Sequence, residues 1–181
     1  MHTNWYIYCL IFACVINNSF GEKQVLVKRI QCALKSKVIA SVDCSKDNDT
    51  SLSFYMKTIH DIVRLYGLSS LYIYITGRKN VVQLKGLRTE FCQSLTERKR
   101  PNLLGLINAG LRKAHTNFPQ KCPFHSNTRY ILEHLQFDSK YLPNYIPEYN
   151  FTYIGKFFMN NVLTAEVKVT GGVCNVGNDC R

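Results

Sequence analysis

The sequence predicts an all-β protein in which two antiparallel sheets pack as a sandwich, with one short helix. Three observations support this fold class. Apolar and polar residues alternate with a period of two in about eight segments, turn-forming residues separate these segments, and a single segment has helical spacing instead. Strands joined by short turns in this way favour antiparallel pairing over alternating strand–helix–strand units.

The first 21 residues are expected to be a signal peptide. They contain no Asp, Glu, Lys or Arg, and the apolar run from Trp5 to Ile16 is about a dozen residues long. A membrane-spanning helix needs about 20 apolar residues, so this run is too short for a retained anchor. Small residues at its end place the cleavage before Glu22, which leaves residues 22–181 as one secreted, extracellular domain.

The predicted strands share branched or aromatic residues at alternating positions. The clearest runs from Leu163 to Thr170 and is expected to end at Gly171-Gly172. Residues 149–159 form the strand before it, with Gly155 as a candidate bulge and Asn160-Asn161 as the hairpin turn. The remaining predicted strands are residues 25–32, 37–43, 52–58, 71–76, a strand that resumes at Val81, and 129–137.

One segment has helical spacing. Pro101 suits the first position of a helix, and apolar residues then recur every three or four positions, which predicts an amphipathic helix over residues 101–116. The apolar face of this helix contains Leu103, Leu104, Ile107, Leu111 and Ala114. Cys92 and Cys122 bracket the helix, so we expect a disulfide between them to hold it against the sheets.

Six cysteines follow the signal segment, and an even number in an oxidising compartment predicts three disulfides. These residues are Cys32, Cys44, Cys92, Cys122, Cys174 and Cys180. The partners of the four cysteines outside the bracketing pair are left open. Asn48 and Asn150 begin glycosylation motifs, as expected of a secreted glycoprotein.

No catalytic or metal-binding signature is present. The chain lacks a Gly-x-Ser-x-Gly elbow, a His-Glu-x-x-His motif and paired CxxC spacings. The histidines after residue 21 are dispersed and are interpreted as surface or packing residues. We therefore expect no catalytic residues, no metal and no cofactor. An enzyme that uses acid–base catalysis ranks third, after the two binding functions given at the end of this subsection. The dispersed histidines are His60, His115, His125 and His134.

The formal net charge of +11 makes the chain distinctly basic. Its basic residues are scattered among apolar segments, whereas a nucleic-acid-binding protein usually concentrates them on one face, so nucleic acid is not an expected partner. A solvated basic surface explains this charge in the simplest way. Attraction to anionic membranes or extracellular polyanions is the alternative.

Aromatic side chains occupy many of the alternating apolar positions of the predicted strands. Large rings of this kind fill a solid core, or they line a pocket for a hydrophobic molecule where the two sheets separate. Strand parity and the helix face together identify the candidate wall residues Phe54, Ile73, Ile75, Leu104, Ile107, Leu111, Phe151, Tyr153 and Phe157.

The part of the chain from Phe118 to Tyr153 resembles a large insect family of secreted proteins that includes the CheA and CheB chemosensory groups. That family is similar to ML lipid-recognition domains such as the ganglioside activator protein and the Niemann-Pick sterol carrier. The likeness covers roughly residues 25–170. The residues that carry it are Lys121-Cys122-Pro123-Phe124, Tyr130, Leu142-Pro143, Ile146-Pro147 and the cysteines Cys32, Cys44 and Cys92.

This resemblance implies an immunoglobulin-like sandwich with an apolar cavity that holds a lipid, sterol or hydrocarbon between its sheets. The leading hypothesis is therefore a secreted carrier or co-receptor for a hydrophobic small molecule, with a membrane receptor or channel as a further partner. The alternative is an extracellular interaction module with a solid core and a basic docking surface.

Overall fold

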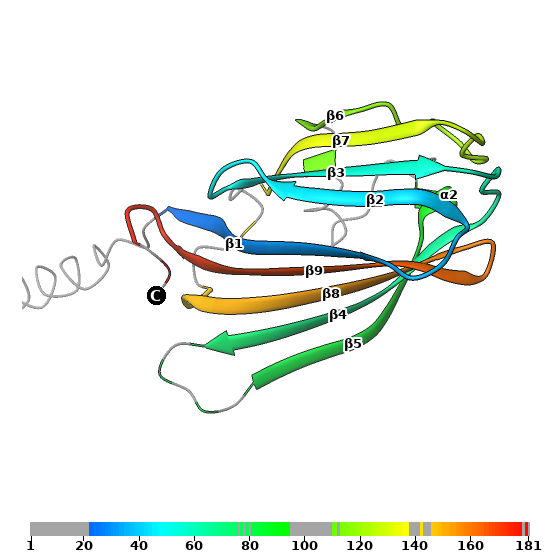
Figure 1. Ribbon diagram of the computed structural model, residues 1–181. Helices are drawn as coiled ribbons and strands as arrows, with labels where there is room; N and C mark the ends of the chain where they lie inside the picture. Colours follow the sequence, from blue (N-terminus) through cyan, green and yellow to red (C-terminus); the bar gives the residue numbers. More distant parts are fainter. Residues whose placement is uncertain are drawn as a thin grey trace, which may run out of the picture.

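The computed structural model describes residues 22–75, 77, 79, 81–94, 110, 111, 113–137, 142, 146–178 and 180, in which two antiparallel sheets pack face to face (Figure 1). The larger sheet has the strand order β1-β9-β8-β4-β5 and the smaller one β2-β3-β7-β6. The predicted all-β sandwich with a short helix is thereby confirmed. The elements are β1 (Lys23–Leu34), β2 (Ile39–Lys46), β3 (Ser51–Thr58), β4 (Leu65–Ile75), β5 (Val81–Glu90), α2 (Phe91–Ser94), β6 (His115–Thr116), β7 (Arg129–Gln136), β8 (Tyr149–Met159) and β9 (Val162–Asn175).

Two clusters of buried side chains join the sheets. The first lies where the ends of β2, β3 and β7 meet the start of β4, and it is centred on Ile62 and Phe124, which are 0% and 2% exposed. The second lies between β3 and β7 on one side and β1 and β9 on the other, where Val27 and Val169 face Leu52 and Leu132. The alternating pattern of these strands puts their apolar residues into the clusters and their polar residues into water.

The β8–β9 hairpin turns at Asn160 and Asn161, as predicted. Both have positive φ angles, 48° and 68°, which is the backbone conformation of a two-residue turn that matches the strand twist. The Asn160 side chain also ties this hairpin to the start of β4, because its Oδ1 accepts hydrogen bonds from the N–H groups of Val63 (3.1 Å) and Arg64 (3.2 Å).

Three local predictions are wrong. Gly155 lies in regular register, and the irregularity in β8 falls between Phe157 and Phe158. β9 continues through Gly171 to Asn175, because its ladder with β1 supplies hydrogen bonds that outweigh the weak strand preference of glycine. The predicted helix cannot reach residue 116, since His115 and Thr116 form β6 against β7.

Most of that predicted helix lies outside the described residues, as does the signal segment 1–21. Gly110 and Leu111 are helical, and the Ala114 N–H donates to the Gly110 carbonyl (3.0 Å). Among the described residues, no helix is long and apolar enough to cross a membrane.

The three expected disulfides are present. Cys92 of α2 is joined to Cys122, which confirms the predicted clip, with Cα atoms 5.5 Å apart. Cys32 of β1 is joined to Cys44 of β2 and so links the two sheets at one edge. The third disulfide, between Cys174 and Cys180, closes the tail after β9. Disulfides of this number are typical of proteins of oxidising compartments.

The closed tail is bonded back to the large sheet. Lys28 Nζ donates to the Cys180 carbonyl (2.7 Å) and to Asn150 Oδ1 (2.8 Å). The Glu148 carboxylate accepts from the Asn175 N–H (3.0 Å) and the Asn178 amide (2.8 Å), and these hydrogen bonds lower the pKa of Glu148. The tail is therefore a fixed part of the sheet edge.

Candidate ligand-binding site

The inner face of β4 and β8 brings together four of the predicted wall residues. Ile73 of β4 lies directly opposite Phe151 of β8, and Ile75 lies opposite Tyr149. Tyr153 is two residues further along β8 than Phe151, so it shares the same face. Phe151 and Tyr153 pack against the second core cluster, which shows that this face is turned toward the small sheet.

Glycines under the rings explain how the aromatic side chains lie. A Cβ atom built on Gly171 would meet the Leu26 carbonyl and approach the Phe151 ring to 2.7 Å. A Cβ on Gly155 would be 2.8 Å from the Tyr153 hydroxyl and 3.1 Å from the Phe157 ring. The three rings therefore lie along the surface of β8 and β9, over positions where no side chain intervenes.

One polar pair lies on this apolar face. The hydroxyl groups of Ser69 and Tyr153 are 2.9 Å apart and share a hydrogen bond. Burial raises the pKa of the Tyr153 phenol, an effect that the Ser69 hydrogen bond partly opposes, so the group is neutral at physiological pH. A neutral hydroxyl pair in apolar surroundings can hydrogen-bond the polar end of a ligand.

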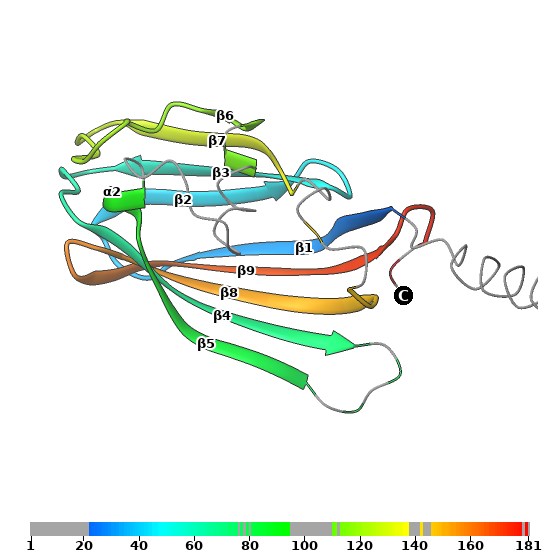
Figure 2. The same ribbon diagram turned by 180° about the vertical axis from the view of Figure 1, so that it is seen from behind.

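The apolar face extends beyond both core clusters. Leu71, Ile73 and Ile75 of β4 are half-buried and belong to neither cluster. Their partners in β5 continue the face: Val82 lies opposite Ile73 and Leu84 lies opposite Leu71. Here β4 and β5 lie farthest from the small sheet, as seen from both sides of the molecule (Figures 1 and 2).

The β5 side chains are open to solvent. Val82, Leu84 and Leu87 are 46%, 40% and 42% exposed, although all three have the parity of the inner face. Apolar side chains exposed next to one another on a sheet edge commonly mark a binding surface. We name the set Leu71, Ile73, Ile75, Val82, Leu84 and Leu87 the apolar ledge.

The other predicted wall residues do not gather on the face of β4 and β8. Phe54 of β3 faces the large sheet and contacts both clusters, Phe157 packs on Phe91 with ring centroids 5.7 Å apart, and Leu111 contacts the second cluster. Leu104 and Ile107 lie outside the described residues. The structure thus brings together the β4 and β8 residues, and it adds the β5 side chains that strand parity had not selected.

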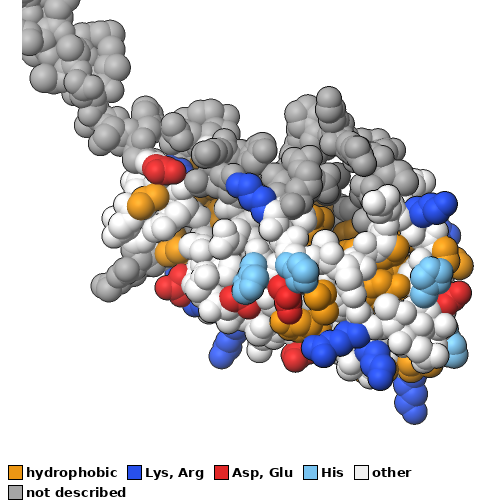
Figure 3. Space-filling view, turned by 90° about the horizontal axis from the view of Figure 1, so that it is seen from above, with side chains coloured by type: hydrophobic (Ala, Val, Ile, Leu, Met, Phe, Trp, Pro, Cys, Tyr) orange, Lys and Arg blue, Asp and Glu red, His pale blue; other side chains and the backbone are white. Residues whose placement is uncertain are grey.

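A polar cluster on the small sheet is a second arrangement that sequence reasoning missed. His134 Nδ1 lies 3.3 Å from Asp47 Oδ2, and the Ser53 hydroxyl donates to the same carboxylate oxygen (2.8 Å). Ser53 also accepts from the His134 N–H (3.2 Å). Histidine and acidic side chains lie side by side on this surface (Figure 3). The positive φ of His134, 57°, marks the bulge that brings it there.

This cluster lacks the contact needed to activate a serine. The Ser53 side chain is only 1% exposed, and its hydroxyl contacts a carboxylate and a backbone amide instead of the His134 imidazole. A nucleophile needs a hydrogen bond to its general base and access for the substrate. Nor is any group of three or more His, Cys, Asp or Glu side chains in the described ranges arranged to hold a metal ion.

The two glycosylation motifs have different surroundings. Asn48 lies in the exposed turn between β2 and β3, where its Oδ1 accepts from the Thr50 N–H (2.8 Å) and hydroxyl (3.0 Å). Asn150 lies at the start of β8 on the outer face of the large sheet and is held by Lys28. Asn48 is the more open of the two.

A family described as "Protein of unknown function (DUF1091)" matches residues 71–153 of this chain. The match runs from the second half of β4 through β5, α2, β6 and β7 to Tyr153 of β8. No curated protein matches the sequence. The matched segment contains all of the apolar ledge and the Cys92–Cys122 clip.

Proposed function

We propose that this chain is a secreted binding protein for a hydrophobic small molecule such as a lipid or hydrocarbon, which it holds without covalent chemistry. The observation that carries the proposal is the apolar ledge, which continues the packed face of β8 out to solvent. Ligand sites in proteins are mostly apolar with few polar groups, and this face combines branched and aromatic side chains with one hydroxyl pair.

The ledge supports binding because its exposure in the free protein is unfavourable. Each apolar side chain removed from water contributes about 25 cal/mol per Å² of buried area. An acyl chain lying on β4 and β5 would cover the exposed side chains of Val82, Leu84 and Leu87 and would contact the half-buried Ile73. Its polar end would reach the hydroxyl of Tyr153.

Secretion belongs to the same proposal. The three disulfides are consistent with an oxidising compartment, and a carrier that works outside the cell would deliver its ligand to a membrane receptor or channel. Such a carrier needs a site that releases its ligand as well as holding it, and a site at the open edge of a sheet allows both.

A pair of triple variants tests the proposal. Val82→Thr, Leu84→Thr and Leu87→Thr together make the β5 part of the ledge polar, and their exposure keeps the cost to folding small. The control replaces three exposed valines elsewhere by threonine: Val63, Val162 and Val176. Native mass spectrometry of the secreted protein and titration with a fluorescent fatty acid measure the bound ligand.

The proposal requires the ledge variant to lose most of its binding while the control binds like the original chain. Equal binding by both variants would show that the ledge is not the site. An original chain that carries no adduct and binds no hydrophobic probe would remove the proposed function itself.

A further inference from the structure

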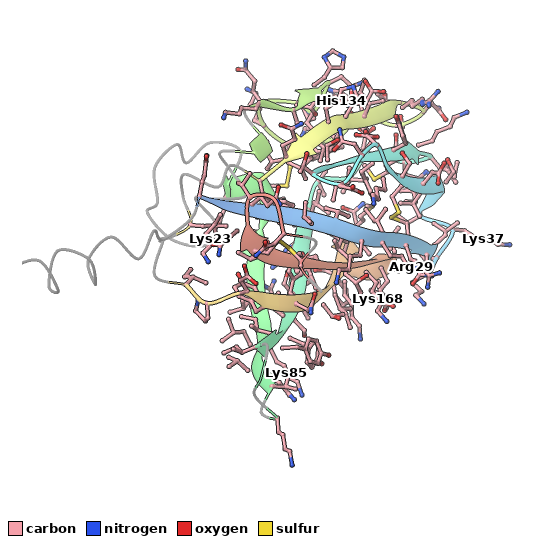
Figure 4. All side chains as sticks on the ribbon, turned by 90° about the vertical axis from the view of Figure 1, so that its left-hand side faces the viewer. Lys23, Arg29, Lys37, Lys85, His134 and Lys168 are labelled. Carbon is pink, nitrogen blue, oxygen red and sulfur yellow. A yellow bond between two sulfur atoms is a disulfide. The ribbon has the colours of Figure 1, made fainter. Side chains whose placement is uncertain are left out.

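The outer face of the five-stranded sheet, turned away from the small sheet, carries a line of basic side chains. On β9, Val167 and Val169 point into the second core cluster, so Lys168 between them points outward. Arg29 of β1 lies opposite Thr170, two residues from Lys168, and therefore lies on the same outer face. Arg29 and Lys168 project to one side of the large sheet (Figure 4).

The line continues across the sheet. Lys156 of β8 lies opposite Glu166, which is two residues from Lys168 on β9, so Lys156 also points outward. Lys156 lies opposite Leu68 of β4, and Leu68 lies opposite Arg88 of β5. Arg29, Lys168 and Lys156 thus follow one diagonal, and Arg88 lies two strands further across in the row of Lys156. We name Arg29, Lys168, Lys156 and Arg88 the basic strip.

The spacing along the strip follows from sheet geometry. Neighbouring strands are about 4.8 Å apart and two residues along a strand span about 6.8 Å, so each diagonal step is about 8 Å between Cα atoms. The step from Lys156 to Arg88 crosses two strands in one row and is about 10 Å. Neighbouring cations of the strip are therefore about 8 to 10 Å apart, with Glu166 directly opposite Lys156 and Glu90 bonded to Arg88.

Three of these four charges are available to a partner. Arg29, Lys156 and Lys168 are exposed, and no ion pair joins any of them to another side chain in the described part of the chain. Arg88 is bonded to Glu90 (2.6 Å) and lies over the Tyr66 ring at 4.1 Å, which fixes its guanidinium group on this face.

The side chains around the strip can hydrogen-bond to a sugar. Thr152, Thr170 and Ser70 carry hydroxyl groups on the same outer face, and Tyr72 presents a ring that Lys85 covers at 5.6 Å. Apart from the tail at Cys180, which packs on Gly172, no described element covers this face.

We propose that the outer face of the large sheet binds a linear sulfated polysaccharide, whose sulfate groups lie along Arg29, Lys168, Lys156 and Arg88. A linear polymer with regularly repeated negative charges can follow cations that are about 8 to 10 Å apart across the sheet. A bilayer surface is a poorer match, because the residues between these cations include no exposed large apolar side chain that would insert into it.

Two charge-matched variants of the full secreted chain test this site. Arg29→Gln, Lys156→Gln and Lys168→Gln remove three cations from the strip. The control, Lys57→Gln, Lys121→Gln and Arg129→Gln, removes one arginine and two lysines that are equally exposed and lie outside the large sheet. Binding is measured to immobilised heparin over a series of NaCl concentrations, with desulfated heparin and phosphatidylserine vesicles as parallel probes.

We expect the original chain to bind heparin at physiological ionic strength and to weaken steeply with added salt, because exposed charges are screened over about 8 Å under these conditions. The strip variant should lose about tenfold or more in affinity, since each exposed ion pair contributes up to about a fivefold factor. The control variant should retain an affinity about tenfold higher than that of the strip variant. Desulfated heparin should not bind.

Three results would overturn the proposal. Equal losses by the two variants would mean that net charge alone drives binding. Absence of heparin binding at physiological ionic strength would mean that the strip has no such partner. Binding to phosphatidylserine vesicles without binding to heparin would assign the face to a membrane surface instead.

Discussion

Removal of the Cys92–Cys122 disulfide should destabilise the chain more than removal of the Cys32–Cys44 disulfide. All four cysteines are half-buried, with Cys92 and Cys122 packed against the first core cluster and Cys32 against the second, so replacement by alanine costs similar packing energy in each pair. The pairs differ in sequence separation, which is 30 residues for the first and 12 for the second. Loop-closure entropy in the unfolded chain is therefore the main difference between them.

The chain-entropy relation gives the magnitude. It assigns about 3.6 kcal/mol to the longer loop and about 2.8 kcal/mol to the shorter one at 25 °C, a difference of about 0.8 kcal/mol. Either loss is a large share of the 5 to 15 kcal/mol, roughly, that stabilises a typical domain. Urea unfolding of the two double-alanine variants, followed by fluorescence of the aromatic residues, measures both values.

The order of stability of the two variants tests the entropic explanation. A Cys92→Ala, Cys122→Ala variant that is more stable than the Cys32→Ala, Cys44→Ala variant would refute the entropic argument. The same first variant also tests whether the clipped segment retains ligand. Faster release of a fluorescent fatty acid from the folded variant would show that the disulfide contributes to ligand retention, and unchanged release would mean that its role is structural alone.

Further predictions concern single side chains. Gly171→Ala should destabilise the fold by roughly 2 to 3 kcal/mol, because the added Cβ meets a backbone carbonyl in a fixed ladder. Gly155→Ala should cost about 1 kcal/mol, because its Cβ meets only movable side-chain atoms. Thermal and urea unfolding measure the stability of both variants. Tyr153→Phe should cost about 1 kcal/mol in urea unfolding and should weaken binding of a fatty acid more than binding of an alkane, because the hydroxyl pair with Ser69 is lost. The pKa of Glu148 is lowered in the folded state, so its carboxylate stabilises the fold at pH values above its ordinary pKa of about 4.5. This stabilisation is lost as the pH falls through the lowered pKa of the folded state. Glu148→Gln should therefore lower the urea midpoint at pH 7, and the difference from the original chain should vanish in strong acid; a constant difference at all pH values would contradict this assignment.

Local information in the sequence was sufficient for much of the fold. The period-two pattern of β8 and β9 and the Asn160-Asn161 turn specify one hairpin without reference to the rest of the chain, because strand faces and turn geometry depend on neighbouring residues. The bracket of Cys92 and Cys122 around one segment also predicted its disulfide. The parity of Ile73 and Phe151 placed them on one face for the same reason.

Only the tertiary structure decided which of these faces are covered and which distant residues meet. Val82 and Leu84 carry the inward parity of a core strand, yet β5 is an edge strand beyond the reach of the small sheet, so their exposure depends on sheet order. The His134–Asp47 contact needs a bulge that no local pattern marks. Arg29 and Lys168 are scattered in the sequence and become neighbours only through the pairing of β1 with β9, because strand pairing over long separations is set by packing of the whole chain.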